Sequence, residues 1–156
     1  MPADHAEGIE VDADGFACAT PQRVWQVLTD YDRLAEFVPN LISSTVLSRH
    51  DHEVVVEQYG SGGFLFVRQE IHMVLRVTEQ PFSTIDVSRI SGNMRRYTAR
   101  WSLAPAREKH CDGTRIRYRA SMQPDFFVPP IAGPAVAQAD VNQMLKAVLA
   151  EIERWQ

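Results

Sequence analysis

Long apolar segments are absent from the sequence. No run of about 18 or more apolar residues occurs, so no helix is expected to span a membrane. The longest uncharged stretch, residues 126–139, is interrupted by three prolines. The acidic first seven residues lack the basic and then apolar layout of a secretory signal peptide. These absences favour a soluble, cytoplasmic protein.

Cysteines and recognisable catalytic motifs are also scarce. The two cysteines, Cys18 and Cys111, offer neither a disulfide framework nor a closely spaced metal pair, and we interpret both as ordinary thiols. The segment His50-Asp51-His52 is typical of an exposed hairpin turn. The glycine-rich residues 59–63 are typical of a flexible hairpin and lack the spacing of a phosphate loop. We therefore predict no metal, no cofactor and no assigned catalytic residue.

The charge is small in total but unevenly distributed. The net charge of -4 and the isoelectric point near 5.7 argue against a general nucleic-acid-binding protein, and no DNA partner is expected. Residues 1–60 carry 11 acidic and 3 basic side chains, whereas residues 61–123 carry 5 acidic and 11 basic ones. This division favours acidic and basic strands that pair across one sheet. The alternative is a basic face for an anionic partner such as RNA or lipid headgroups.

Two short helices are predicted near the N-terminus. Thr20 before Pro21 indicates a helix start, because the hydroxyl can cap the helix and proline suits its first position. Asp30 is placed to cap a second short helix that carries Phe37 and ends at Pro39. With almost no loop between them, the two helices should form a bent pair.

Alternation of apolar and polar residues predicts seven strands. They are expected at residues 8–19, 42–49, 54–59, 64–79, 83–90, 96–103 and 114–122. Turn residues between them include those at 80–81, 91–93 and 112–113. The segment 64–79 is long for a strand and indicates a strongly curved sheet. One face of the sheet should be apolar and shielded from water, and we call it the dry face. The other face carries Arg68, Arg76, Arg96, Arg100, Arg115, Arg117 and Arg119.

A long amphipathic helix is predicted over residues 134–155. Its apolar stripe consists of Val141, Leu145, Val148, Ile152 and Trp155, with Met144 alongside. The dry face of the sheet is the only large apolar surface on which this stripe can lie. One helix cannot fill a strongly curved sheet, so we expect an elongated apolar cavity between them. The predicted architecture therefore suits a protein that holds an apolar ligand.

The candidate ligand contacts lie on the dry face and at its ends. Gln69, Tyr97, Trp101 and Tyr118 place polar tips there that can orient a carbonyl or hydroxyl group. Each of the four is also compatible with a core residue that its neighbours satisfy. The full predicted ligand-binding set is Phe37, Gln69, Ile71, Met73, Tyr97, Trp101, Tyr118, Met122, Phe126, Phe127, Met144 and Val148.

The proline-rich segment 126–134 joins the last strand to the long helix. Its adjacent Phe126 and Phe127 are expected to form a lid over the cavity or an apolar tip that contacts a membrane. The alternative is a plug beneath the start of the helix. Arg95 shares the alternation of Tyr97, but its position beside a turn favours exposure to solvent.

The order of elements resembles the helix-grip fold of the START-like (SRPBCC) superfamily, which includes the birch pollen allergen, aromatase/cyclases and lipid-transfer START domains. The segment DYDRLAEFVPNL at residues 30–41, followed by Ser44 and Val46, resembles the polyketide cyclase/dehydrase branch with its coenzyme Q-binding proteins and ribosome-association toxin. The resemblance spans residues 8–155. It implies an α+β fold in which a curved antiparallel sheet of about seven strands wraps around a long C-terminal helix.

The resemblance further implies a single START-like domain over residues 1–156, with residues 1–7 as a loose tail, and a hydrophobic cavity. Because this scaffold hosts unrelated functions, it names no ligand. Our first hypothesis is binding or transport of a lipid, prenylated quinone or polyketide-like molecule. The alternatives are a polyketide cyclase or dehydratase, for which no acid or base residue is evident, and a ribosome-associated protein that binds through the arginine-rich face.

Overall fold

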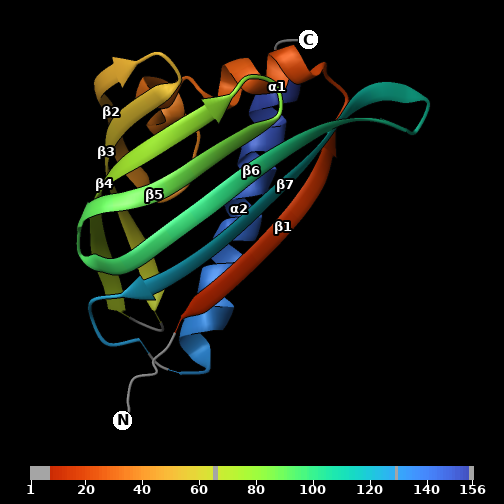
Figure 1. Ribbon diagram of the computed structural model, residues 1–156. Helices are drawn as coiled ribbons and strands as arrows, with labels where there is room; N and C mark the ends of the chain where they lie inside the picture. The colour runs from red at the N-terminus through yellow and green to blue at the C-terminus, as the bar shows by residue number, and fades with distance from the viewer. Residues whose placement is uncertain (1–7, 65–66, 129, 155–156) are drawn as a thin grey trace.

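The computed structural model describes residues 8–64, 67–128 and 130–154. Its seven strands form one antiparallel sheet in the order β1-β7-β6-β5-β4-β3-β2, curved around the long helix α2 (Figure 1). The predicted helix-grip architecture and element order are confirmed. The element bounds are β1 (Ile9–Ala17), α1 (Pro21–Leu28), η1 (Tyr31–Glu36), β2 (Leu41–His50), β3 (Glu53–Phe64), β4 (Val67–Gln80), β5 (Thr84–Gly92), β6 (Met94–Glu108), β7 (Cys111–Pro124) and α2 (Ala132–Arg154).

The two short helices follow β1 as predicted, although only the first is capped as expected. The Thr20 hydroxyl accepts a hydrogen bond from the backbone N–H of Arg23, and Pro21 opens α1. The second helix, η1, is a single 3-10 stretch, and Asp30 makes no side-chain capping bond. Asp30 occupies the N-cap position as predicted, but its carboxylate lies 3.5 Å from the Arg33 guanidinium and does not cap the helix.

Two predicted turns lie inside strands. Residues 59–63, predicted as a flexible hairpin, belong to β3 and pair with β4. The long strand predicted over residues 64–79 corresponds to β4, which begins at Val67. Residues 112–113 belong to β7, and the β6–β7 turn is made by Lys109 and His110, both with positive φ. Gly113 is needed for close approach, because a Cβ there would lie 2.2 Å from the carbonyl oxygen of Ala17.

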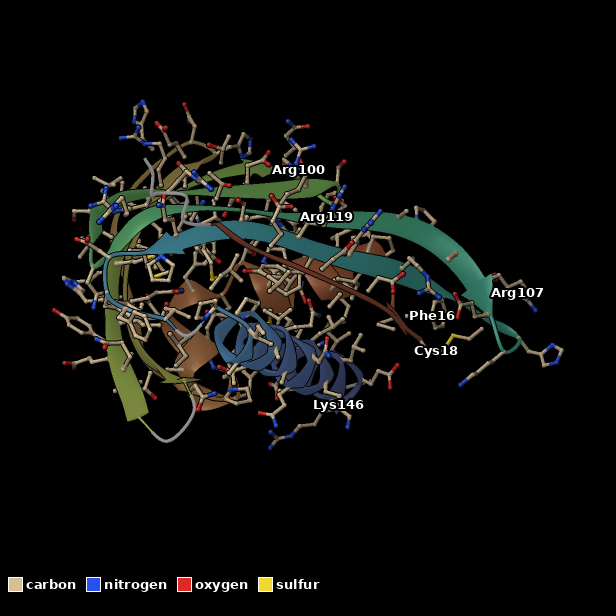
Figure 2. All side chains as sticks on the ribbon, turned by 90° about the horizontal axis from the view of Figure 1, so that it is seen from below. Phe16, Cys18, Arg100, Arg107, Arg119 and Lys146 are labelled. Atoms are coloured by element: carbon tan, nitrogen blue, oxygen red, sulfur yellow. A yellow bond between two sulfur atoms is a disulfide. The ribbon has the colours of Figure 1, made fainter. Side chains whose placement is uncertain are left out.

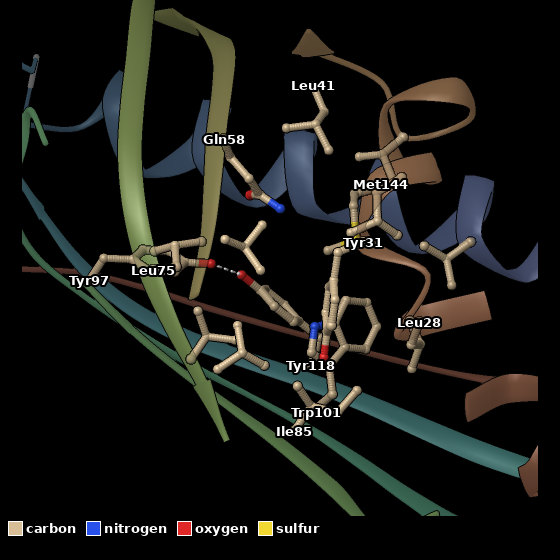
Figure 3. A pocket seen from close by; sticks show the side chains of 16 residues that line it. Leu28, Tyr31, Leu41, Gln58, Leu75, Ile85, Tyr97, Trp101, Tyr118 and Met144 are labelled. Carbon is tan, nitrogen blue, oxygen red and sulfur yellow. Dashed lines mark hydrogen bonds between the residues drawn. The ribbon is translucent and has the colours of Figure 1, made fainter. Parts of the chain in front are cut away.

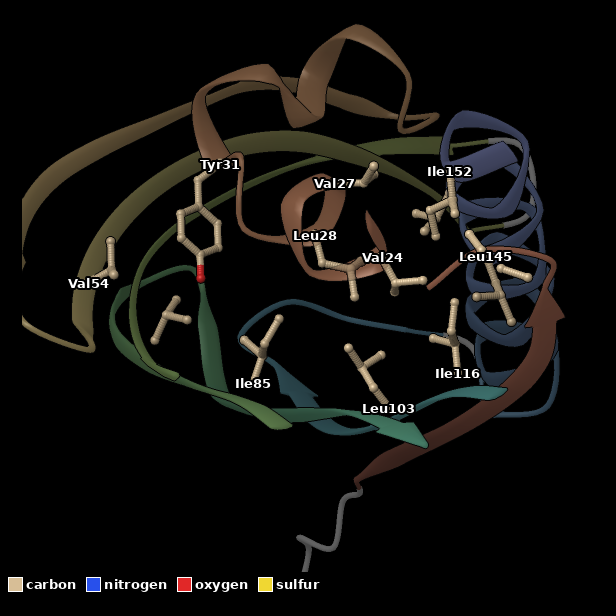
Figure 4. Close-up of a cluster of buried hydrophobic side chains, with 14 of the residues drawn as sticks. Val24, Val27, Leu28, Tyr31, Val54, Ile85, Leu103, Ile116, Leu145 and Ile152 are labelled. Carbon is tan, nitrogen blue, oxygen red and sulfur yellow. The ribbon is translucent and has the colours of Figure 1, made fainter. Parts of the chain in front are cut away.

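The apolar stripe of α2 packs onto the concave face of the sheet. Leu145, Val148 and Ile152 join the main core with residues of α1 and the sheet, and Figure 4 shows this cluster looking along the helix. Val141 and Ala137 join a second cluster with β1, β6 and β7. Trp155 and the predicted tail of residues 1–7 lie outside the described residues. No helix in the described ranges is long and apolar enough to span a membrane.

Side chains from the helical layer bond to both edge strands. The Gln138 amide on α2 donates to the carbonyl oxygen of Asp12 at 2.8 Å and accepts from its N–H at 3.3 Å. At the opposite edge, the Asp32 carboxylate of η1 accepts from the N–H of Val46 at 2.8 Å. The helices therefore contact β1 and β2 through backbone groups as well as through the apolar core.

The convex face carries the arginines, and most of them are paired. Figure 2 shows Arg100 and Arg119 on this face. The ion pairs are Arg76–Glu53, Arg100–Asp86, Arg115–Asp14, Arg115–Glu108, Arg117–Asp12 and Arg119–Asp12. Arg96 bonds to Ser121, and the side chain of Arg68 lies outside the described part of the chain. The prediction that acidic and basic strands pair across the sheet is confirmed.

The two cysteines form a disulfide, which corrects their interpretation as ordinary thiols. The pairing of Ala17 with Thr114 brings the end of β1 beside the start of β7. Cys18 and Cys111 then face each other with a Cα–Cα distance of 5.9 Å, within the range for a disulfide. Figure 2 shows the bond near the β6–β7 hairpin. The 93 residues between them in the sequence conceal this proximity.

Candidate ligand cavity

A cavity of about 180 Å³ lies between the concave face of the sheet and α2, beneath α1 and η1 (Figure 3). Two α-helices, η1 and six of the seven strands contribute to its wall, so it is a feature of the whole fold. Its sixteen described lining residues include no charged side chain. They are Leu28, Tyr31, Leu34, Val38, Leu41, Val56, Gln58, Leu75, Val77, Ile85, Val87, Tyr97, Trp101, Tyr118, Met144 and Val148.

Two tyrosine hydroxyls meet inside this cavity. The hydroxyl oxygens of Tyr97 on β6 and Tyr118 on β7 lie 2.6 Å apart, and Figure 3 shows this bond. The strand register places Tyr118 opposite Trp101, so the two tyrosines are not direct cross-strand partners. The pair Ala99 and Ala120 lies between them in the register, and these small side chains leave room for the phenol rings to lean together.

The hydroxyl pair is a hydrogen-bonding group that keeps its protons. Burial raises the pKa of Tyr97 above its usual value. Burial also raises the pKa of Tyr118, and the neighbouring Tyr97 raises it further. One O–H donates to the other oxygen within the pair, which leaves the second O–H with no further partner among the described residues. The pair can therefore donate to an acceptor atom in the cavity.

Trp101 and Gln58 add further polar atoms to the apolar wall. The rings of Trp101 and Tyr118 lie 4.8 Å apart between centroids at a tilt of 56°. On β3, the Gln58 amide nitrogen donates to the Ser44 hydroxyl at 3.2 Å, which positions the side chain. Its carbonyl oxygen remains an acceptor beside the cavity.

A buried carboxylate supports the wall that η1 contributes. Tyr31 lines the cavity with its ring and donates its hydroxyl hydrogen bond to Glu79 near the end of β4. The Arg49 guanidinium binds both oxygens of Glu79, at 3.1 and 3.3 Å. Burial and the bond to Glu79 raise the pKa of Tyr31 far above its usual value. Tyr31 therefore remains a neutral donor that fixes η1 against the sheet.

Five of the twelve predicted ligand contacts line the cavity: Tyr97, Trp101, Tyr118, Met144 and Val148. Ile71 and Met73 are half-buried on β4, but the β4 residues that line the cavity are Leu75 and Val77. The strand continues past the cavity toward the β3–β4 hairpin, which places Ile71 and Met73 beyond its wall. Gln69 lies still nearer the hairpin and bonds to the backbone of Glu70.

The other predicted contacts lie elsewhere in the fold. Phe37 packs against the main core beside a polar hollow between α1 and α2, and Met122 packs against the second core cluster. Phe126 and Phe127 line a separate hollow of about 340 Å³ near the start of α2. Arg95 is exposed, as expected, and pairs with Asp125 at 2.9 Å.

Alternation within the strands contained signals for polar residues that the sequence analysis missed. Gln58 follows Val54 and Val56 at a spacing of two, which places it on the same face as these buried valines. Glu79 follows Leu75 and Val77 in the same way and is only 6% exposed. A carboxylate continuing a buried apolar series indicates a buried partner. In the described ranges, no group of three His, Cys, Asp or Glu side chains is arranged to hold a metal ion.

Comparisons with known proteins agree with this architecture. Residues 18–149 match the family model described as polyketide cyclase / dehydrase and lipid transport. The structure is similar to the Zhui aromatase/cyclase of a Streptomyces species, with a TM-score of 0.77, 17% identity, and 95% of each chain covered. A START superfamily protein from Mycobacterium smegmatis matches with a TM-score of 0.76 and 14% identity, covering 95% of this chain and 99% of that one.

A STAR-related lipid transfer protein from Xanthomonas axonopodis is also similar, with a TM-score of 0.75 and 18% identity, covering 92% of this chain and 85% of that one. No curated protein sequence matches the chain. At these identities the similar structures show the fold alone. The expected resemblance to the START-like superfamily is confirmed.

Proposed function

The chain belongs to the polyketide cyclase / dehydrase and lipid transport family, and we propose that it binds a hydrophobic small molecule in the cavity between sheet and α2. The observation that carries this proposal is an apolar cavity of about 180 Å³ with hydroxyl, amide and indole groups at its wall. Apolar burial supplies affinity in such a site, and a few convergent polar groups fix orientation.

The first experiment is native mass spectrometry of the freshly purified protein, followed by solvent extraction and identification of any retained molecule. We expect the protein to retain a small apolar molecule, which appears as added mass in the native spectrum and is recovered by extraction. The variant Val87→Phe should lose it, because the added ring occupies the cavity that Val87 lines.

Val74→Phe is the matched control, because Val74 follows the opposite alternation to Leu75 on β4 and does not line the cavity. Equal retention of the extracted molecule by both variants would place the binding site outside the cavity and contradict the proposal. Loss in Val87→Phe alone supports it.

Catalysis of cyclisation or dehydration is the second candidate function, favoured by the donor that the Tyr97–Tyr118 pair offers to a carbonyl oxygen. Because burial raises the pKa of both hydroxyls, they stay protonated near neutral pH and are not available as general bases. Such an enzyme would act by shaping its substrate and polarising a carbonyl. Turnover of a poly-β-keto substrate that the double variant Tyr97→Phe/Tyr118→Phe loses would support it, and no turnover by the wild type would contradict it.

We also propose that the segment 126–134 contacts a membrane surface. Its side chains Phe127 and Ile131 are 83% and 88% exposed, which is unusual for large apolar groups. Flotation with phosphatidylcholine vesicles should recover the wild type and lose the variant Phe127→Ser/Ile131→Ser; equal recovery of both would remove this role. The ribosome alternative loses its main support, because the arginines proposed to carry it are largely paired with carboxylates.

A further inference from the structure

We propose that the cavity selects a small, electrically neutral ring compound carrying a hydroxyl or carbonyl oxygen, bound by the Tyr97–Tyr118 hydroxyl pair. This inference rests on the proposed binding function and names the ligand class. It excludes long-chain lipids, prenylated quinones and carboxylate ligands from the cavity. Size, charge and hydrogen bonding each support it separately.

The size of the cavity limits the ligand to one or two fused rings. An engineered apolar cavity of about 150 Å³ in another protein holds a benzene molecule. The present cavity, at about 180 Å³, is only slightly larger and is smaller than the roughly 300 Å³ at which drug-sized sites begin. A long prenyl or acyl tail does not fit within that volume.

The wall of the cavity disfavours an ion. The described lining contains no charged side chain, and its polar atoms are neutral hydroxyl, amide and indole groups. A carboxylate that entered would lose its water without gaining a cationic partner, which is strongly unfavourable. The cavity therefore distinguishes a phenol or ketone from an acid of the same shape.

The hydroxyl pair supplies the orienting contact. Two tyrosines bring two O–H groups, and their mutual bond of 2.6 Å uses one of them. The remaining O–H points to no described protein acceptor, and an unpaired buried donor carries an energetic penalty. A ligand oxygen that accepts this hydrogen bond removes the penalty, whereas a pure hydrocarbon does not. The pair therefore favours an oxygen-bearing ring over a hydrocarbon ring.

Isothermal titration calorimetry with four probes at neutral pH tests the inference. The probes are 2-naphthol, naphthalene, 2-naphthoate and 1-dodecanol, which vary the oxygen, the charge and the length in turn. We expect 2-naphthol to bind about tenfold more tightly than naphthalene, because it gains one hydrogen bond. The anion 2-naphthoate and the long chain of 1-dodecanol should both bind more weakly than 2-naphthol.

The double variant Tyr97→Phe/Tyr118→Phe is the matched protein control. Replacing both partners by apolar groups of the same shape should leave the protein folded, and the ratio of the 2-naphthol affinity to the naphthalene affinity should fall from about tenfold to about one. The preference for 2-naphthol should disappear. A preference that persists in this variant would overturn the role of the hydroxyl pair while leaving naphthalene binding intact.

The remaining outcomes separate the ligand class from the binding function. Tighter binding of 2-naphthoate or 1-dodecanol than of 2-naphthol would overturn the ligand class and leave cavity binding standing. Failure of all four probes to bind the wild type would overturn the proposed function itself, and this inference with it.

Discussion

The Tyr31 hydroxyl is hydrogen-bonded to the buried Glu79 carboxylate, which joins η1 to the far end of β4. Arg49 on β2 binds the same carboxylate, so one buried acidic group connects three separate elements beside the cavity. Buried charges are stable in proteins when they are paired and hydrogen-bonded, and Glu79 meets both conditions.

Removal of this hydroxyl should destabilise the protein measurably. We expect Tyr31→Phe to lower the free energy of unfolding by about 1–3 kcal/mol, because a hydrogen bond to a charged group is lost. Urea denaturation followed by circular dichroism measures the change. Tyr59→Phe is the control, because the Tyr59 hydroxyl makes only a long 3.4 Å contact to Glu57. A loss in Tyr31→Phe no greater than in this control would contradict a structural role for the Tyr31–Glu79 bond.

The cavity tyrosines should make the fold sensitive to alkali. Their folded pKa values lie above the usual tyrosine value of about 10, so the unfolded chain releases these protons at lower pH than the folded chain does. The contribution of these two protonated hydroxyls to the free energy of unfolding is fully present below about pH 10. It is lost as the pH rises toward the folded pKa values. Urea denaturation at a series of alkaline pH values measures this slope.

In the same titration, the variant Tyr97→Phe/Tyr118→Phe should lose stability less steeply above about pH 10, because two groups with raised pKa values are gone. Absorbance at the tyrosinate band reports when the remaining tyrosines ionise. Identical slopes for wild type and variant would show that the cavity hydroxyls do not carry the effect.

Reduction of the disulfide should lower the melting temperature. The Cys18–Cys111 bond joins residues separated by 93 positions, and chain-entropy arguments assign such a loop about 4.6 kcal/mol of stability. For a domain of this size that corresponds to roughly 10 °C. Thermal unfolding with and without dithiothreitol measures the shift. The variant Cys18→Ser/Cys111→Ser should melt at the temperature of the reduced wild type, with or without dithiothreitol. A melting temperature of the variant that changes with dithiothreitol would show that the shift has another cause.

Neutralising the acidic partners should expose the positive charge of the convex face. Asp12 lies 2.8 Å from Arg117 and 3.8 Å from Arg119, and Asp86 lies 2.6 Å from Arg100. The variant Asp12→Asn/Asp86→Asn should elute from a heparin column at higher salt than the wild type, because unpaired arginines attract polyanions.

The control for this elution shift is Glu36→Gln/Asp51→Asn, which removes the same charge away from these arginines. An equal shift in both variants would attribute retention to net charge and not to the paired face.

Sequence alternation predicted the faces of the strands better than it predicted the extent of the cavity. Tyr97, Trp101 and Tyr118 lie on the concave face and line the cavity as expected. Ile71 and Met73 follow the same alternation but lie outside the cavity wall. A period of two fixes which face a side chain takes, whereas the distance a cavity reaches along a strand depends on the elements that cover it.

The choice of aromatic side chain at the cavity depends on the helices, which the alternation within the strands does not describe. The position of η1 determines that Tyr31 rather than Phe37 lines the cavity, and nothing in the local sequence distinguishes these two aromatics. The disulfide was missed for a related reason. Cys18 and Cys111 become neighbours only through the pairing of β1 with β7, the first strand with the last.

The side-chain bonds to the two edge strands also affect how the protein behaves at high concentration. An open sheet offers unpaired N–H and C=O groups at each border, where a second molecule can add a strand and begin aggregation. Gln138 presents an amide to Asp12 much as a neighbouring peptide group would, and Asp32 presents an acceptor to Val46. At both borders, part of the template for intermolecular strand addition is already occupied by the protein's own helical layer.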